Sequence, residues 1–256
     1  MITATLIGGG TPQMVQIVID ATPAGVPWTL TGSVDDQTWP VPGGVGVGDG
    51  GQLVLTDNRA PGNRPIVYTF AAGAARQASE PIVVPFSTDF VLQSLTGSRS
   101  LALELYSGSL NTELSSNHAQ FRIPGRSRPS IRYDVGGDIE GNFGVIVERD
   151  QAQTFREMIL EGGPLLYRLG AELADIDPVG VIAYGDLSSE LLPRHGKRVW
   201  RLPYTLIDDP YLDVRLGAFS WDDVDAALAG MTWTEFDTRF AALTWDQVDT
   251  FDWATI

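Results

Sequence analysis

The chain has 256 residues, enough for two domains of ordinary size that each bury a core. Its net charge of -15 repels phosphate groups, so we expect neither a nucleic-acid partner nor a membrane-surface partner. Cysteine is absent, which excludes disulfides and thiolate metal sites. With no membrane-length apolar run and no signal-peptide pattern, we expect a soluble protein made without a signal peptide. The 28 Gly and 16 Pro favour strands joined by turns, and hence a mainly β fold.

Residues 1–85 contain short apolar or β-branched runs, each bounded by Gly, Pro, Asn or Asp. The runs lie at 14–19, 28–30, 53–56, 66–70 and 82–84. Five short strands at this spacing predict a β-sandwich of the immunoglobulin or fibronectin type, with Tyr68 facing its core.

A glycine-rich segment, GGVGVGDGG, interrupts these runs. Gly46, Gly48 and Gly51 satisfy the dinucleotide fingerprint G-x-G-x-x-G, but that site needs a helix after the last glycine. The strand-like sequence QLVLT follows instead. We therefore interpret the segment as a flexible turn, with nucleotide binding as the less favoured alternative.

Residues 86–212 are expected to form a second domain. It begins with a connection at 86–100, a half-buried strand at 101–105 and an exposed loop at 107–120. Further strands are predicted at 130–135, 143–148, 165–169, 179–184 and 198–207. In the last of these, alternate residues form one apolar face, and Pro203 indicates an edge position or a bulge. That face consists of Trp200, Leu202, Tyr204 and Leu206.

One helix is predicted between these strands. Asp150 is placed to cap its first turn and Gln153 stands at the capping-box position. Glycines at 162 and 163 end it. Its buried face is expected to consist of Phe155, Met158 and Ile159.

Three pieces of this domain together resemble the minor tail proteins of long-tailed phages of actinobacteria. They are PGR at 124–126, VIAYGD at 181–186 and W-x-L-P at 200–203, within a resemblance that covers about residues 50–256. The resemblance implies an immunoglobulin-like module followed by a split-barrel-like α+β domain with one helix, as in distal tail and baseplate proteins.

The same resemblance implies a function. Such a protein is a structural component of the tail tip that forms a hexameric ring or a trimer. It links the tail tube or tape measure to hub or fibre proteins, and it supports assembly and host attachment. It is made in the host cytoplasm and resides in the virion, and the family brings no catalytic residues.

Basic residues concentrate before the first strands of this domain and before its last strand. The two groups are Arg122, Arg126, Arg128 and Arg132, and Arg194, Lys197, Arg198 and Arg201. One interpretation is an inter-subunit surface, because arginine pairs carboxylates bidentately. Its candidates are Arg122, Arg126, Arg128, Arg198 and Arg201. The alternative is a solvated face, or pairing within the domain with Asp134, Asp138, Glu140 and Asp186.

Residues 213–256 form an acidic tail with a twelve-residue repeat: SWDDVDAALAGM, TWTEFDTRFAAL and TWDQVDTFDWAT. Each unit has Ser or Thr three positions before Asp, Glu or Gln, the spacing of a capping box, so each predicts a short helix. Short helices need packing partners. We expect docking onto a basic groove of another subunit; the alternative is packing on the same chain. The docking candidates are Trp221, Val224, Trp233, Phe236, Trp245 and Val248.

The sequence offers no recognisable catalytic motif, and we expect no enzyme, metal or cofactor. His118 and His195 lack metal-ligand spacing, and no G-x-S-x-G occurs. Acidic pairs would serve glycoside hydrolysis only inside a cleft. These pairs are Asp134 with Asp138, Asp175 with Asp177, and Asp208 with Asp209. The alternative function is a carbohydrate-binding adhesin that contacts cell-wall glycans through the N-terminal module or exposed Trp28 and Trp39.

Overall fold

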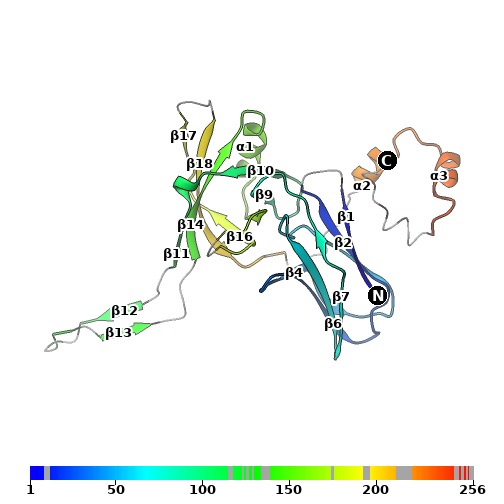
Figure 1. Ribbon diagram of the computed structural model, residues 1–256, viewed down its shortest axis with the longest axis horizontal. Coiled ribbons are helices and arrows are strands. Elements are labelled where there is room, and N and C mark those ends of the chain that lie inside the picture. Colours follow the sequence, from blue (N-terminus) through cyan, green and yellow to red (C-terminus); the bar gives the residue numbers. More distant parts are fainter. Residues whose placement is uncertain are drawn as a thin grey trace. The chain divides into compact units, whose positions relative to one another are not determined.

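The computed structural model describes residues 1–8, 12–114, 118–122, 124, 127–128, 130–133, 139–173, 176–192, 197–211, 221–244, 248, 251 and 253. The described chain is mainly β, as its composition predicts. It divides into two compact units, and Figure 1 labels most of their elements. The first unit consists of Met1–Ser87, Arg168–Ala171 and Asp209–Ile256, and the second of Thr88–Tyr167 and Glu172–Asp208. Sequence analysis places the boundaries at 85 and 212 and does not anticipate the grouping of Arg168–Ala171.

Two sheets make up the β part of the first unit. One has the strand order β1 (Ile2–Ile7), β2 (Met14–Ile19), β5 (Leu53–Asp57). The other has the order β4 (Gln37–Val47), β3 (Pro27–Val34), β6 (Pro65–Ala72), β7 (Ala75–Ala78), and β8 (Ile82–Val83) pairs with β6. In β6 every second side chain is buried, and Tyr68 faces the core as predicted. Each of the five predicted runs overlaps a strand, whereas β1, β4 and β7 were missed.

The tryptophans and glycines of this unit correct two expectations. Trp28 and Trp39 are buried, with 2% and 6% of their surface exposed, so they do not offer the glycan contacts proposed for them. The glycine-rich segment continues β4 through Val47 rather than forming a flexible turn. Across the β3–β4 ladder Trp28 lies opposite Gly46, and Trp39 opposite Gly32. A Cβ on Gly32 would lie 2.5 Å from the Trp39 ring, so packing of the indoles requires glycine.

The second unit is built on a closed six-stranded barrel. The barrel strands are, in spatial order, β14 (Ile139–Val147), β10 (Ser100–Leu105), β9 (Phe90–Ser94), β15 (Leu165–Leu169), β16 (Val179–Tyr184) and β18 (Arg198–Ile207). The last two residues of β15 group with the first unit. Antiparallel pairing of β14 with β18 closes the ring, and the two strands lie side by side in Figure 1. Closure leaves these strands no open edge for aggregation.

Shorter elements extend the barrel. β11 (Asn111–Leu114) follows the short 3-10 helix Ser107–Ser109 and pairs with β14, and β17 (Ser188–Leu191) pairs with β18. β12 (His118–Phe121) and β13 (Ser130–Tyr133) form a separate two-stranded hairpin. The expected connection at 86–100 therefore contains β9, and the expected loop at 107–120 contains two strands. The first expectation was wrong because β9 is buried throughout its first four residues and shows no alternation. The second was right about exposure, since β11 is exposed, but missed that β11 pairs with β14.

Aromatic residues fill the barrel. Phe90, Phe143 and Tyr167 are buried, and the ring centroids of Phe90 and Phe143 lie 5.0 Å apart. Tyr204 stacks on Phe143 at 4.3 Å with an interplanar angle of 13°. Such pairs stabilise a core by about 0.5–1.5 kcal/mol each beyond the area that they bury. Burial raises the pKa of the Tyr167 hydroxyl, which stays protonated at neutral pH.

The predicted helix is present as α1 (Ala152–Glu161), but its start differs from the expectation. The N-cap residue is Gln151, and its side chain does not cap the helix. The side-chain amide of Gln151 instead donates a hydrogen bond to the carbonyl oxygen of Ala102 at 2.8 Å. Gln153 bonds Glu157 instead of closing a capping box. Phe155 and Met158 are buried, and Gly162 ends the helix as predicted.

Pro203 sits where β18 changes neighbours. On one side Pro203 pairs with Asn142 of β14. On the other side, pairing with β17 ends at Arg201 and pairing with β16 begins at Tyr204. Pro203 thus falls in a gap between two partners, where its missing N–H leaves the ladders intact.

The tail contains the helices α2 (Trp221–Ala227) and α3 (Trp233–Phe240). Within the described residues, neither these helices nor α1 has the length and apolarity needed to cross a bilayer.

Candidate functional site

The predicted docking residues of the tail have different environments. Trp221 opens α2, and Val224 in the same helix is half-buried. Trp233 opens α3 and is 81% exposed, whereas Val248 is 8% exposed. Trp245 lies outside the described residues. The best-defined candidate surface of the tail is therefore α3.

A capping box holds the start of α3, as the sequence predicts. The Thr232 hydroxyl accepts a hydrogen bond from the Glu235 amide, and a Glu235 carboxylate oxygen accepts from the Thr232 amide at 2.8 Å. The hydrogen bond from the Thr232 backbone amide and, after it, a bond of 2.8 Å that the Thr232 hydroxyl donates to the same carboxylate lower the pKa of Glu235. The start of the helix is thus stabilised by two residues that are three positions apart in the sequence.

The apolar face of α3 is covered at one end only. Trp233, Phe236 and Phe240 follow one another at helical spacing, with ring centroids 5.8 Å and 4.6 Å apart. Phe240 is buried because Phe251 and Trp253 pack on it at 5.2 Å and 5.7 Å. The chain therefore covers the C-terminal end of the face itself and leaves Trp233 exposed.

Sequence analysis missed the three residues that close this cluster, which are Phe240, Phe251 and Trp253. They lie at positions that the three units do not share, whereas the repeat drew attention to the second and fifth residues of each unit. The spacing of Phe240 seven residues after Trp233 was the available signal, since that distance returns to the same helix face.

The first group of predicted inter-subunit arginines lies on the β12–β13 hairpin or at its turn. Arg122, Arg128 and Arg132 are exposed, and Arg126 lies outside the described residues. Phe121 at the end of β12 is 54% exposed. The hairpin segment 118–133 contains four arginines and no Asp or Glu, so it is a basic element in an acidic protein.

Three residues of the second basic group form ion pairs or hydrogen bonds with other residues of the barrel unit. Lys197 Nζ lies 2.6 Å from Glu148, and the hydrogen bond between them raises the pKa of Lys197. Arg201 lies 3.6 Å from Glu190, and Arg198 donates to the Ser189 hydroxyl. The partners differ from those expected from sequence, and Arg194 lies outside the described residues.

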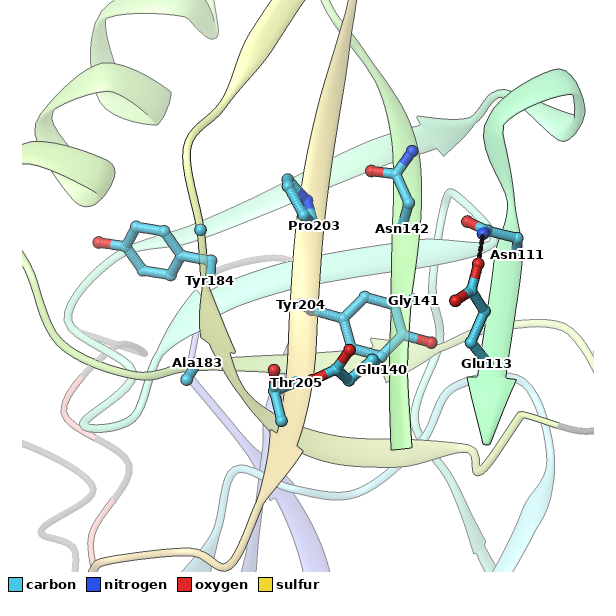
Figure 2. Close-up of a pocket in the computed structure, with 11 residues that line it drawn as sticks. Asn111, Glu113, Glu140, Gly141, Asn142, Ala183, Tyr184, Pro203, Tyr204 and Thr205 are labelled. Carbon is cyan, nitrogen blue, oxygen red and sulfur yellow. Dashed lines mark hydrogen bonds between the residues drawn. The ribbon is translucent and has the colours of Figure 1, made fainter. Parts of the chain in front are cut away.

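A cavity of about 370 Å³ opens on the barrel wall where β11, β14, β18 and β16 run side by side (Figure 2). Strand register aligns its outer side chains in two rows. Asn111, Asn142 and Pro203 form one row, and Glu113, Glu140 and Thr205 form the other. Tyr204 lies beneath, and its hydroxyl is 3.4 Å from that of Thr112. The lining combines carboxylates, amides and a hydroxyl with the rings of Tyr204 and Pro203.

Two glutamates of this cavity face each other across the β11–β14 ladder. Glu113 is directly opposite Glu140, and like charges in this position are destabilising. Glu113 accepts a long hydrogen bond from the Asn111 amide at 3.4 Å. Among the described residues neither carboxylate forms an ion pair. The cavity therefore holds two charged acceptors available to hydroxyl or amide donors.

A buried polar network lies in the first unit and was not anticipated. Asp57 accepts hydrogen bonds from the Tyr68 hydroxyl at 2.8 Å and the Trp39 indole at 3.0 Å, which joins β5 to the other sheet. Arg168 donates to the Ala60 carbonyl at 2.6 Å and lies over the Phe86 ring. Burial lowers the pKa of Arg168 to about 10, so it remains charged at neutral pH.

A second buried pair continues this network. Arg59 is 3% exposed and its guanidinium lies 2.7 Å from the carboxylate of Asp209, which is 10% exposed. Asp209, which is adjacent to Asp208 in the sequence, is therefore an ion-pair partner of Arg59 and not half of a carboxylate pair. The network joins residues 57–59, 168 and 209 within the first unit, and its satisfied bonds indicate a structural role.

The remaining candidate residues for chemistry are the two histidines and the acidic pairs. His118 lies in β12, and His195, Asp134, Asp138 and Asp175 lie outside the described residues. Within the part of the chain that the structure describes, no three His, Asp or Glu side chains gather as a metal site would require.

Comparison with protein-family models gives no match to this chain, and comparison with curated proteins gives none either.

Proposed function

We propose that this chain is a structural protein of a phage tail tip, a minor tail protein that self-associates and links the tail tube to hub or fibre proteins. The observation that carries the proposal is the half-covered aromatic face of α3, with Trp233 81% exposed. An exposed tryptophan rimmed by acidic side chains is the chemistry of an interface anchor. The sequence resemblance to phage tail proteins supplies the context.

The rest of the chain fits an assembly role. The closed barrel of the second unit and the two sheets of the first unit each form a folded scaffold with its own buried core. The acidic tail and the basic hairpin each carry an exposed aromatic residue, and they are opposite in charge. In this proposal the function is non-catalytic.

Immunogold electron microscopy of the phage particles that carry this gene tests the proposal. We expect antibody against the chain to label the tail tip, and the chain to co-purify with intact particles. Label at the capsid, or particles that lack the chain and still have complete, infective tails, would refute a tail-tip role.

A second candidate function is glycan binding, now placed at the barrel cavity because Trp28 and Trp39 are buried. Carboxylates and amides that accept and donate hydrogen bonds, next to the Pro203 ring, suit a polyhydroxylated ligand.

Calorimetric titration with soluble cell-wall oligosaccharides tests glycan binding. We expect Glu140→Gln to weaken binding about tenfold or more, by loss of a charged acceptor, and Glu80→Gln, an exposed glutamate of the first unit, to leave it unchanged. Absence of binding at millimolar ligand would remove this candidate, and cleavage of the glycan would contradict a non-catalytic function.

A further inference from the structure

We infer that the β12–β13 hairpin of one copy binds the exposed end of α3 in a second copy. This inference rests on the self-association in the proposed function and names the two surfaces that perform it. The inference rests on the strand register of the hairpin and on the exposure and opposite charge of the two surfaces.

The hairpin presents an aromatic and a basic side chain on one face. Ala119 pairs with Arg132 and Phe121 with Ser130, and directly paired residues project to the same side of a ladder. Phe121 and Arg132 are therefore on the same face, and both are exposed. Among the described residues β12 and β13 pair only with each other. A two-stranded hairpin is marginal in water, so a covering partner would stabilise it.

The complementary face lies on α3. Asp237 follows Trp233 by four residues, so the exposed carboxylate and the exposed indole are neighbours on the helix surface. An arginine can stack on the indole and reach the carboxylate with the same guanidinium. Segment 221–253 carries eight acidic residues against Arg239 alone, opposite in charge to the hairpin.

The occupant we propose is a second copy, because each chain carries one surface of each kind. Hairpin-to-tail contact is heterologous, so each copy would offer a free hairpin at one side and a free α3 at the other. Repetition of such a contact produces a closed ring or an open chain. The closed ring is the form that agrees with the proposed tail-tip function.

Sedimentation velocity of the full chain provides the first test. We expect self-association at about 0.1 M salt that weakens at about 1 M, where the Debye length falls from about 10 Å to about 3 Å. Arg132→Glu and Asp237→Arg should each weaken association about tenfold or more, and the double variant should recover most of it. Arg149→Glu, an exposed arginine outside the hairpin, should have no effect. A monomer at every concentration, or association insensitive to both reversals, would overturn the inference.

A cross-linking test separates a second copy from the same chain. Because the protein has no cysteine, one thiol can be introduced per variant. Ala119→Cys mixed with Thr234→Cys should form a disulfide-linked dimer that contains both variants, and Ala119→Cys mixed with Arg149→Cys should not.

A chain with both Ala119→Cys and Thr234→Cys that closes only an internal disulfide would assign the hairpin to its own tail and overturn the proposal. These measurements use the purified protein alone. A failed association with correct tail-tip labelling would therefore reject the hairpin–helix contact and leave the tail function standing.

Discussion

At the residue scale, Gly32 and Gly46 leave room for the two buried tryptophans of the first unit. An added methyl group on Gly32 would meet the Trp39 ring at 2.5 Å, and the ring is held by its bond to buried Asp57. We therefore expect Gly32→Ala to lower the free energy of unfolding of this unit by roughly 1–3 kcal/mol, the usual cost of overpacking. Urea denaturation followed by tryptophan fluorescence measures this.

The matched control is Gly51→Ala, where the closest atom is 3.3 Å away on the exposed side chain of Asp49. Asp49 accepts hydrogen bonds from the Gly51 amide and the Thr22 hydroxyl, but a shift of a few tenths of an ångström relieves this contact, so the midpoint should change much less. Equal destabilisation by both variants would mean that the contact with the indole does not set the cost at Gly32.

The burial of the two tryptophans and of Arg168 could not be predicted from the sequence. Trp28 and Trp39 were expected to be exposed, because their burial depends on which residues lie opposite them once β3 and β4 pair. The burial of Arg168 depends on Ala60, which is 108 residues away in the sequence. Local patterns contain neither the register nor these long-range partners, whereas the alternation that buries Tyr68 is local and was predicted.

At the element scale, the capping box makes the start of α3 sensitive to acid. The folded-state pKa of Glu235 is depressed, so its contribution to helix stability is fully present above the unfolded value near 4.5 and is lost as the pH falls through the lower folded value. The amide proton resonance of Thr232 should therefore titrate with a midpoint below 4.5. Glu235→Gln should abolish that titration, and a midpoint at or above 4.5 would show that the bond does not form.

The aromatic face of α3 predicts different outcomes at its two ends. Phe240 is 5% exposed and contacts Phe251 and Trp253, so Phe240→Ala should remove the helical amide signals of the tail. Trp233→Ala should keep them, because the indole is 81% exposed, while it weakens self-association. Two-dimensional NMR of both variants distinguishes these effects. Loss of the helix in Trp233→Ala would indicate that the tryptophan packs on its own chain.

Among the elements, those specified by neighbouring residues were predictable from the sequence. The box of Thr232 and Glu235 and the glycine end of α1 at Gly162 are examples. β9 was taken for a connection, because a strand buried on both faces shows no alternation. The barrel cavity was missed as well, since Glu113 and Glu140 become neighbours only through the β11–β14 register.

At the scale of the whole molecule, a buried ion pair holds the chain just before the acidic tail begins. Asp209 pairs with Arg59 at 2.7 Å, whereas Phe240 of α3 packs on Phe251 and Trp253 of the tail itself. A chain that ends at residue 217 keeps Asp209 and should unfold at nearly the full-length temperature. A chain that ends at residue 208 leaves Arg59 buried without this carboxylate, which should cost about 3–5 kcal/mol.

Differential scanning calorimetry of the two truncated chains measures this difference, and Asp209→Asn in the full chain isolates the charge from the backbone. We expect Asp209→Asn to behave like the shorter truncation product in the stability of the first unit. The chain that ends at 217 should also have lost self-association, since α3 is removed while both β units remain folded. If that chain unfolded several degrees below the full-length protein, the acidic tail would be part of the folded core and not a docking element.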